Sequence, residues 1–412
     1  MTDQPLAGRT IIDLTTALAG PYATLLLAGL GATVIKVENP ATGGETARNN
    51  APYVGKQGLS LQRRDPDDMS VSMLVRGRNK LSVTLNLKDP LARPVFADLV
   101  RDADAVVENY SPGVTERLGI DYATVREINP RIVYTSISGF GSQGGRGSGK
   151  AMDSIVQALS GVMMTAGEPG DDPVRFGLPV GDLMAPLFAV IGTLSALMQA
   201  DHTGEGQHVD VSMLGALTSL VACEPFEALD AVGIPQRTGS MVPRLAPFGI
   251  LPAADGHVAL CAPTDAFAHG TLRAIGRPEL IDDDRFASRD QRVRHADELH
   301  EVIRAWCAGR PVAEVVEVLT EHGVPAAEVR EPREAVRDPL VRDREEVVPI
   351  AHPRYGTATE LTATGMPIRF SAAKAGFDRP APALGEHNDH VYRERLGYSE
   401  RQIAELSTHS VI

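Results

Sequence analysis

Two aspartates follow glycine-rich loops at the starts of predicted helices, where a carboxylate could act as a nucleophile. The first considered is Asp182, the single carboxylate in the stretch 177–200, GLPVGDLMAPLFAVIGTLSALMQA, whose apolar run continues to Met198. Pro186 suits the first turn of a helix, which predicts that Asp182 lies just before that helix, towards the partly positive backbone amides. A carboxylate held there, against an apolar wall and away from water, can attack an electrophile. The alternative is that Asp182 only caps the helix, a common role for aspartate.

The second aspartate, Asp153, follows the loop GFGSQGGRGSGK and is predicted to cap the helix that continues with SIVQALSG. The loop fits GxxxxGK between a strand and a helix, the pattern of a nucleotide-triphosphate site, but Ala151 stands where a magnesium-binding hydroxyl is needed. We therefore expect a loop that presents Lys150 to some anion. GxSxG is absent, and the scattered histidines and three distant cysteines predict neither a hydrolase triad, a disulfide framework nor a metal site.

Composition restricts the class of protein. The 412 residues are 43% hydrophobic and 23% charged, which is typical of a globular chain with two domains. The net charge of −13 argues against a nucleic-acid partner. The N-terminus lacks the pattern of a signal peptide, which predicts a cytoplasmic protein. The uninterrupted apolar run after Asp182, about sixteen residues, predicts a buried helix and no membrane span.

The N-terminal half alternates between strand and helix patterns. Residues 10–38 read strand, helix, strand, which indicates a βαβ unit and a parallel, doubly wound sheet. Further strands are predicted in 80–87, 104–110, 131–141 and 204–213. Residues 40–72 carry no sustained period and are interpreted as a surface excursion. Before the strand at 80–87, the basic residues Arg76, Arg78 and Lys80 indicate either a solvated face or a phosphate contact.

The C-terminal half predicts a smaller domain and a short tail. A hairpin signal at Asp255–Gly256 and helical patterns at 296–309 and 310–323 indicate an α/β domain over residues 245–325. The predicted organisation is a large domain over 1–225, a linker over 226–244, the small domain, and a segment over 326–412 that returns to the large domain. That segment contains the short strand patterns EVVPIA, GTATELTATG and PIRFS, and a last helix with a capping box from Ser399 to Gln402.

Many segments, in the same order along nearly the whole chain, resemble the family III CoA-transferases, a group that includes formyl-CoA:oxalate, carnitine and bile-acid CoA-transferases. The resemblance implies an α/β fold in which a Rossmann-like large domain is built from both termini and a smaller domain spans the middle. It also implies a homodimer of two interlocked rings. The segments that carry it are PLAGRTIIDLTTALAGPYATLLLAGLGATVIKVENP, RGRNKLSVTLNLKDP, VVENYSPGVTERLGIDY, NPRIVYTSISGFG, MDSIVQALSG, the GD of Gly181–Asp182, TGEGQHVDVSM, APFGILPAADG, HGVPAAEV and ALGEHND.

The same resemblance implies a reaction in which Asp182 is the nucleophile. It would attack an acyl-CoA and form a mixed anhydride, then an aspartyl-CoA thioester, from which a free carboxylic acid takes the CoA. Coenzyme A and acyl-CoA are then substrates, and no tightly bound cofactor is expected. Water must be excluded, and backbone amides near Asp182 and Gly239 are expected to meet the oxyanions.

The CoA-binding residues that the resemblance implies come from several loops. They are Leu18, Ala19, Leu85, Asn86, Leu87, Lys88, Asn109, Tyr110, Ser111, Arg117, Lys150, Met152 and Asp153. The sequence departs from the formyl-CoA enzymes at Leu18, where they carry a glutamine, and at Asn39, where they carry an arginine. The loop around Gly239 also lacks their glycine run. The departures at Leu18 and Asn39 argue against oxalate as the acceptor, and the departure around Gly239 implies a different gating of the active site.

Two other functions are weighed against CoA transfer. The α-methylacyl-CoA racemases share the fold but need a histidine immediately before the aspartate that aligns with Asp153, and here that residue is Met152. A CoA-binding protein without catalysis would leave Asp182 as a helix cap. A covalent CoA adduct on Asp182 would distinguish transfer from both.

Overall fold

The computed structural model describes residues 4–142 and 151–412, and the chain forms two compact units. The first unit contains Met1–Ser160, Gly177–Val221 and Val336–Ile412, and the second contains Gly161–Phe176 and Ala222–Ala335. The predicted domains had their limits at 225, 245 and 325. Residues 161–176, which the sequence analysis assigned to the large domain, belong to the second unit.

A six-stranded parallel sheet organises the first unit, in the order β6-β2-β1-β7-β8-β9. Both neighbours of β1 run parallel to it, so that Ile12 stands opposite Ile35 on one side and Val106 on the other. The chain starts in the middle of the sheet, builds one side, and then returns to build the other, which places a topological switch point between β1 and β7. The predicted α/β fold with a large parallel sheet is confirmed. The strands are β1 (Thr10–Asp13), β2 (Thr33–Glu38), β6 (Lys80–Thr84), β7 (Ala105–Glu108), β8 (Val133–Ser138) and β9 (His208–Ser212).

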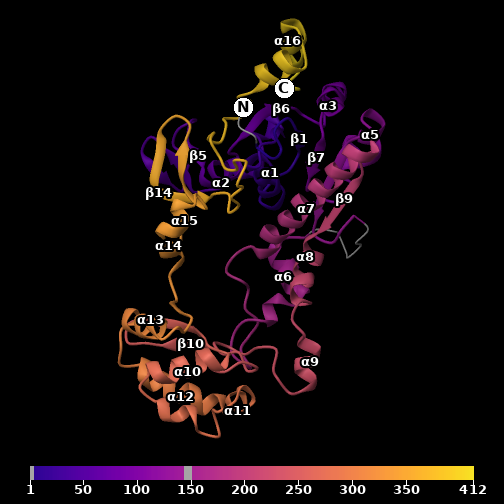
Figure 1. Ribbon diagram of the computed structural model, residues 1–412. Helices are drawn as coiled ribbons and strands as arrows, with labels where there is room; N and C mark the ends of the chain where they lie inside the picture. Colours follow the sequence, from indigo (N-terminus) through magenta and orange to yellow (C-terminus); the bar gives the residue numbers. More distant parts are fainter. Residues whose placement is uncertain (1–3, 143–150) are drawn as a thin grey trace. The chain divides into compact units, whose positions relative to one another are not determined.

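Helices cover both faces of this sheet (Figure 1). Ile12 and Val106 belong to the core on one face, and Ile11 and Val107 to the core on the other. Because successive strand side chains point to opposite faces, a sheet buried on both sides reads as a continuous apolar run. The helices of the first face are α3 (Ala92–Arg101) and α5 (Tyr122–Ile128), and those of the second are α1 (Ala19–Gly29) and α7 (Val180–Thr203), which contact one another. The other helices of this part are α4 (Val114–Leu118), α6 (Asp153–Ser160) and α8 (Met213–Val221).

Helix α7 is long and apolar enough to cross a membrane, a criterion that core helices of soluble proteins also meet. In its most apolar window, 44% of the helix is buried inside the protein. Leu197 belongs to the core that α7 shares with the sheet. The helix therefore packs on the sheet as part of the first unit.

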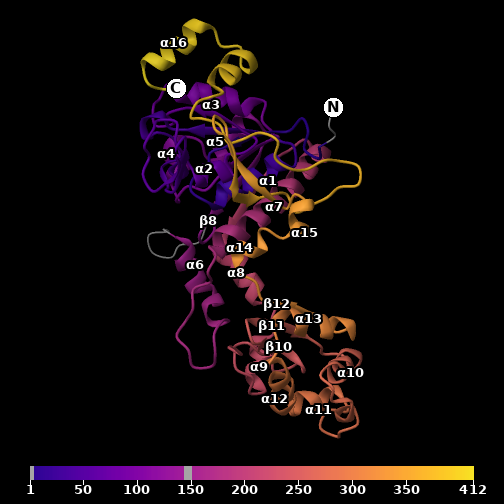
Figure 2. The same cartoon turned by 90° about the vertical axis from the view of Figure 1, so that its left-hand side faces the viewer.

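The C-terminal segment packs on the edge strand β6 (yellow in Figures 1 and 2). The Asn86 amide donates to the carbonyl of Val411 at 2.7 Å, and the His387 amide donates to Ser82 at 2.9 Å. The segment contains a π-helix over Asp389–Arg395 and α16 (Glu400–Thr408). The predicted capping box of α16 is confirmed. The predicted strand at PIRFS is wrong, because residues 367–371 are irregular.

The predicted surface excursion at 40–72 is folded. It forms a sheet of β4-β3-β5 and leads into α2 (Val71–Arg76), which packs with Val54, Ile350 and Ala363. This small core fixes α2 at one side of the unit (Figure 1). Its elements are β3 (Tyr53–Gly55), β4 (Gly58–Ser60), β5 (Met69–Ser70), α15 (Pro339–Asp343), β13 (Val347–His352), β14 (Gly356–Thr364) and 3₁₀ turns at Pro40–Thr42 and Thr46–Asn49.

The second unit is built around a three-stranded antiparallel sheet, β10-β11-β12 (Figure 2). The predicted hairpin at Asp255–Gly256 joins β10 to β11. One core buries Leu260, Leu272, Ile303 and Leu319 between the sheet and its helices. The elements are β10 (Phe248–Pro252), β11 (His257–Cys261), β12 (Ala326–Glu328), α9 (Phe226–Ala231), α10 (Asp265–Ala274), α11 (Arg289–Arg294), α12 (Ala296–Cys307), α13 (Val312–Glu321), α14 (Pro332–Ala335) and 3₁₀ turns at Val162–Met164 and Pro278–Ile281.

Candidate active site

The loop after β1 is held at the switch point of the sheet by two side chains. Asn109, directly after β7, accepts from the Thr16 amide at 2.8 Å and donates to the Thr16 carbonyl at 2.9 Å. Glu45 accepts from the amide of Ala17 at 3.0 Å, where the backbone has a φ of 65°. The carboxyl ends of parallel strands at a switch point are where doubly wound sheets bind ligands. The clamped loop leads directly into α1.

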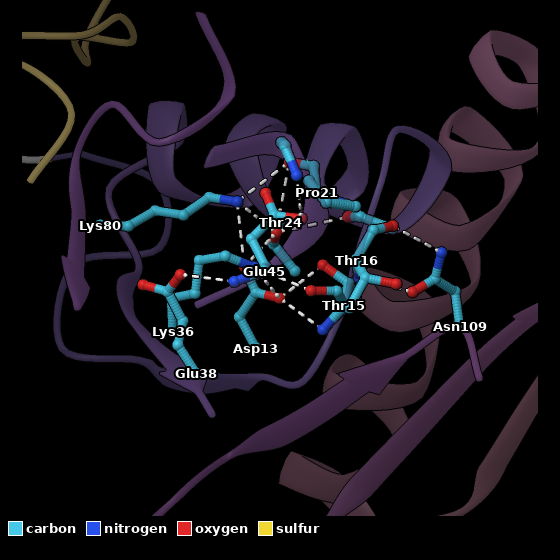
Figure 3. A network of polar contacts seen from close by, with 12 residues as sticks. Asp13, Thr15, Thr16, Pro21, Thr24, Lys36, Glu38, Glu45, Lys80 and Asn109 are labelled. Atoms are coloured by element: carbon cyan, nitrogen blue, oxygen red, sulfur yellow. Dashed lines mark hydrogen bonds and ion pairs between the residues drawn. The ribbon is translucent and has the colours of Figure 1, made fainter. Parts of the chain in front are cut away.

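A buried ionic network supports this loop from below (Figure 3). The Asp13 carboxylate lies 2.9 Å from Lys80 Nζ and 3.7 Å from Lys36 Nζ, and all three side chains are buried. Asp13 also accepts hydrogen bonds from the Thr15 and Thr24 hydroxyls. Burial alone would raise the pKa of Asp13, but the charges of the two lysines hold that pKa well below its usual range. Burial lowers the pKa of Lys80 to about 8.

This network corrects the interpretation of the basic cluster before β6. Lys80 is buried against Asp13, and Arg78 donates to the Thr364 carbonyl at 2.6 Å and lies over the ring of Phe377. Neither residue belongs to a solvated face or contacts a free surface where phosphate could bind. Arg76, the third member of the cluster, is partly exposed, and its buried Nε has no hydrogen-bond partner among the described residues.

Asp182 lies in the first turn of α7, because the helix begins at Val180. The predicted start was wrong: Pro186 lies inside the helix, and Asp182 does not precede it. Asp182 supplies no capping hydrogen bond. A proline has no amide hydrogen, so Pro186 leaves the Asp182 carbonyl without the donor that would normally follow four residues later. At the helix start the first amides have no acceptor within the helix, and Pro179 at the N-cap supplies none, so these amides depend on an acceptor from elsewhere in the chain.

Asp153 supplies that group. Its Oδ1 accepts from the Gly181 amide at 2.8 Å and from the Asp182 amide at 3.4 Å. Asp153 was predicted to cap its own helix, and instead it caps α7. Gln157, buried one turn further along α6, donates to Asp153 Oδ2 at 2.7 Å and to the Leu178 carbonyl at 3.1 Å. A Cβ on Gly181 would lie 3.1 Å from Asp153 Oδ1, so glycine allows this close approach.

The environment of Asp182 favours a basic carboxylate. Burial raises the pKa of Asp182 to about 6, the negative charge of Asp153 adds to the rise, and the positive charge of Arg76 opposes it. Among the described residues, none donates a hydrogen bond to the Asp182 side chain. A carboxylate that is desolvated and not hydrogen-bonded keeps its lone pairs available for attack.

Two adjoining cavities contain most of the predicted CoA-binding residues. A cavity of about 320 Å³ contains Asp182 and the predicted residues Leu18, Ala19, Asn109, Tyr110, Ser111, Met152 and Asp153. A cavity of about 570 Å³ contains Leu85, Leu87, Lys88, Tyr110 and Arg117, together with Asn39. Thr16 and Tyr110 line both cavities, so the two adjoin, and together they are called the groove below.

Three predicted positions fall outside this groove. Asn86 lines neither cavity, and its backbone amide donates to the Val411 carbonyl in the C-terminal segment. Lys150 lies outside the described residues. Gly239 belongs to the second unit, and its amide donates to the Gly167 carbonyl at 3.1 Å. Within the part of the chain that the structure describes, no group of three or more side chains could hold a metal ion.

Sequence reasoning missed Glu45, Gln157 and Arg76. Glu45 lies in a segment without periodicity, and Gln157 faces inward from a helix that was predicted without regard to its partners. Arg76 was noticed, but only as one charge of a cluster. The structure distinguishes Arg76 from the rest of the cluster through the backbone that follows it: Asn79 has a positive φ, and Lys80 begins a buried strand.

Comparison with known proteins gives the same result for family and fold. The model of CoA-transferase family III matches residues 6–388. A succinyl-CoA–D-citramalate CoA-transferase of Chloroflexus aurantiacus is 32% identical over 99% of this chain and 98% of that protein. An acetyl-CoA:oxalate CoA-transferase of Acetobacter aceti is 35% identical over 95% of both. The crystal structure of a CAIB/BAIF family protein from Brucella suis is similar with a TM-score of 0.81 and 29% identity, over 96% of this chain and 100% of that one.

Proposed function

This chain belongs to CoA-transferase family III, and we propose that it transfers CoA from an acyl-CoA to a small carboxylic acid through covalent intermediates on Asp182. The observation that carries the proposal is the state of this carboxylate. It is partly buried, has a pKa raised to about 6, and lies in a cavity that adjoins the larger one with Lys88 and Arg117. At pH 7 such a group is ionised in roughly nine molecules of ten, yet it is more basic than an exposed aspartate.

The proposed reaction conserves the activated acyl group. An Asp182 oxygen attacks the thioester carbon, the C–S bond breaks, and CoA leaves as a thiolate from a mixed anhydride. The thiolate then attacks the aspartyl carbonyl carbon, which releases the first acid as a carboxylate and leaves an aspartyl-CoA thioester. The carboxylate of the second acid attacks that thioester, and the thiolate returns to the new acyl carbon. Asp182 is regenerated, and no other source of activation is needed.

The groove accounts for binding of the CoA thioester. Lys88 and Arg117 would meet phosphate charges in the larger cavity, and the acyl end would reach Asp182 in the smaller one. The first amides of α1 have no side-chain cap, and Leu18 and Ala19 at this helix end line the smaller cavity. A helix start of this kind favours negative charge, including the oxyanion formed at the thioester.

The racemase alternative is not favoured. Proton transfer beside a thioester needs a positioned pair of acid and base groups. The residue before Asp153 is Met152, whose side chain is exposed and cannot accept a proton. The relatives compared above are both named as CoA-transferases.

We also propose that the enzyme is a homodimer of interlocked rings. Large apolar side chains are exposed along α6 and α7 and just before each of these helices, which is unusual for a surface that faces only water. The most exposed are Met152, Leu178, Ile191 and Met198. A second copy of the chain would cover them. Light scattering should report twice the mass of one chain, and a monomer at micromolar concentration would contradict the proposal.

The test of the mechanism is to trap the intermediate. Wild-type protein is incubated with acetyl-CoA or succinyl-CoA, quenched and digested, and the peptide that contains Asp182 is examined by mass spectrometry for a CoA thioester. Asp182→Ala should form no adduct and transfer no CoA, while its affinity for CoA stays within a few-fold of wild type. Asp284→Asn, which removes an exposed carboxylate, is the matched control. Transfer by Asp182→Ala at the native rate would show that another group is the nucleophile.

A further inference from the structure

Gln157 is a fully buried side chain on α6 that lines neither cavity of the groove. Its exposed fraction is 0%, and substrate bound in the groove would not touch it. A buried amide needs hydrogen-bond partners, because leaving its polar atoms without them is costly. The partners of Gln157 therefore indicate why a polar residue occupies this position.

These partners require an NH2 group. Gln157 Nε2 donates to Asp153 Oδ2 at 2.7 Å and to the Leu178 carbonyl at 3.1 Å. Both partners are acceptors, so the atom between them must supply two hydrogens, which an amide carries and a carboxylate does not. Asp153 lies four residues earlier on the same helix, a spacing that places both side chains on one face. Leu178 lies just before α7, so Gln157 joins α6 to the chain that leads into α7.

The start of α7 depends on side chains for its position against α6. The two helices contact one another, but the residues 161–176 between them belong to the second unit. Asp153 Oδ1 accepts from the Gly181 amide at 2.8 Å and from the Asp182 amide at 3.4 Å. One carboxylate is thus bound through one oxygen to Gln157 and through the other to the backbone of Asp182.

We propose that Gln157 is a positioning residue for the reaction at Asp182. The inference rests on the function proposed above. Gln157 orients the carboxylate of Asp153, and Asp153 holds the amides from which the Asp182 side chain projects. Attack requires reacting atoms about 3–3.5 Å apart, and a misplacement of about 1 Å can cost about 100-fold in rate. Without the amide of Gln157, Asp153 Oδ2 would lose this partner, and the carboxylate could rotate away from the start of α7.

Burial alone does not account for an amide at this position. An apolar side chain of the same length, such as methionine, would fill a similar space without the cost of removing polar atoms from water. Methionine has no hydrogen to donate, so it could not hold Asp153. The amide matches the carboxylate that reaches the backbone of Asp182.

The experiment measures formation of the Asp182–CoA adduct in a single turnover, with acetyl-CoA or succinyl-CoA, whichever reacts faster with wild type. At saturating acyl-CoA, Gln157→Met should slow adduct formation by about 100-fold and leave the affinity for CoA within about 3-fold of wild type. Gln157→Glu keeps the shape without the two hydrogens and should lose at least as much at pH 8. Ser160→Ala removes another buried polar group from the same helix and is the packing control. Its rate and affinity should both stay within about 3-fold of wild type.

A double-mutant cycle tests whether Gln157 acts through Asp153. In Asp153→Ala the acceptor for the amides of α7 is already lost, so adding Gln157→Met should slow adduct formation by less than about 3-fold further. The full loss in this background would show that Gln157 supports the fold independently of Asp153, and would overturn the positioning role. Urea unfolding checks that each variant is folded, and Gln157→Glu replaces Gln157→Met in the cycle if the methionine variant does not fold.

The positioning role and the proposed mechanism fail in different ways. A Gln157→Met enzyme that forms the adduct at the native rate would overturn the positioning role and leave the mechanism intact. An equal loss of rate and of CoA affinity would also overturn it, since it would indicate a general disturbance of the groove. Absence of the adduct in wild type would instead overturn the mechanism.

Discussion

Replacing Asp182 with asparagine should stabilise the folded protein at neutral pH. Burial and the charge of Asp153 raise the pKa of Asp182 from its usual value near 3.8 to about 6. The folded state therefore binds this proton more tightly than the unfolded state, so stability is lost as the pH rises from about 4 through 6. Asparagine has the same shape and carries no charge, so it avoids this loss.

The size of the effect follows from the shift. One pKa unit corresponds to about 1.36 kcal/mol, so the shift of about two units sets an upper limit of about 3 kcal/mol. The side chain is partly exposed, and solvent screening reduces the expected value to about 1–2 kcal/mol. The difference should shrink as the pH falls to 4, where the carboxyl is protonated in the folded state and roughly 40% protonated in the unfolded state.

Urea unfolding from pH 4 to pH 8 measures this difference. Circular dichroism follows the whole chain, whereas the fluorescence of Trp306, the single tryptophan, reports on the second unit and serves as an internal reference. Asp284→Asn, the exposed control, should show no such gain. If Asp182→Asn were equal to or less stable than wild type at pH 7.5, the ionised carboxylate of Asp182 would not destabilise the folded state. A gain of the same size at every pH would point to packing and not to charge.

Two further substitutions test the neighbours of the site. Asp153→Asn removes the negative charge next to Asp182 but keeps an oxygen that can cap the helix. The pKa of Asp182 should fall, so the acidic limb of the pH profile of kcat/KM should move below pH 6. An unchanged limb would show that Asp153 does not influence the pKa of Asp182. Asp13→Asn leaves Lys36 and Lys80 buried without their counter-charge, so urea unfolding should show a loss of about 3–5 kcal/mol, and a loss below about 1 kcal/mol would contradict the role of this network.

The architecture of the sheet could be predicted because its causes are local. Strands β1 and β2 are short runs rich in β-branched residues, and the crossover between them is an apolar helix, so residues 10–38 alone indicate a parallel sheet. The hairpin at Asp255–Gly256 and the capping box at Ser399 are also local. The short strand patterns near the C-terminus were less reliable, and the one at 367–371 is irregular.

The site could be predicted only in part, because its partners are far apart in the sequence. The start of α7 depends on Asp153, which lies 28 residues away from Gly181, and no pattern around Pro186 reveals it. Lys80 was interpreted as part of a solvated face or of a phosphate contact, because its partner, Asp13, lies 67 residues earlier. A sequence shows that a charged residue is present, but the role of that residue depends on which residues the fold brings into contact with it.

The surroundings of Asp182 act on its pKa in opposite directions. Burial and the charge of Asp153 raise the pKa of Asp182, and the charge of Arg76 lowers it; the result, about 6, keeps the proposed nucleophile ionised at neutral pH while leaving it basic. In the proposed mechanism, the free enzyme therefore meets acyl-CoA with an ionised Asp182, and the acceptor acid arrives when Asp182 is bound to CoA as a thioester and carries no charge to repel the acid.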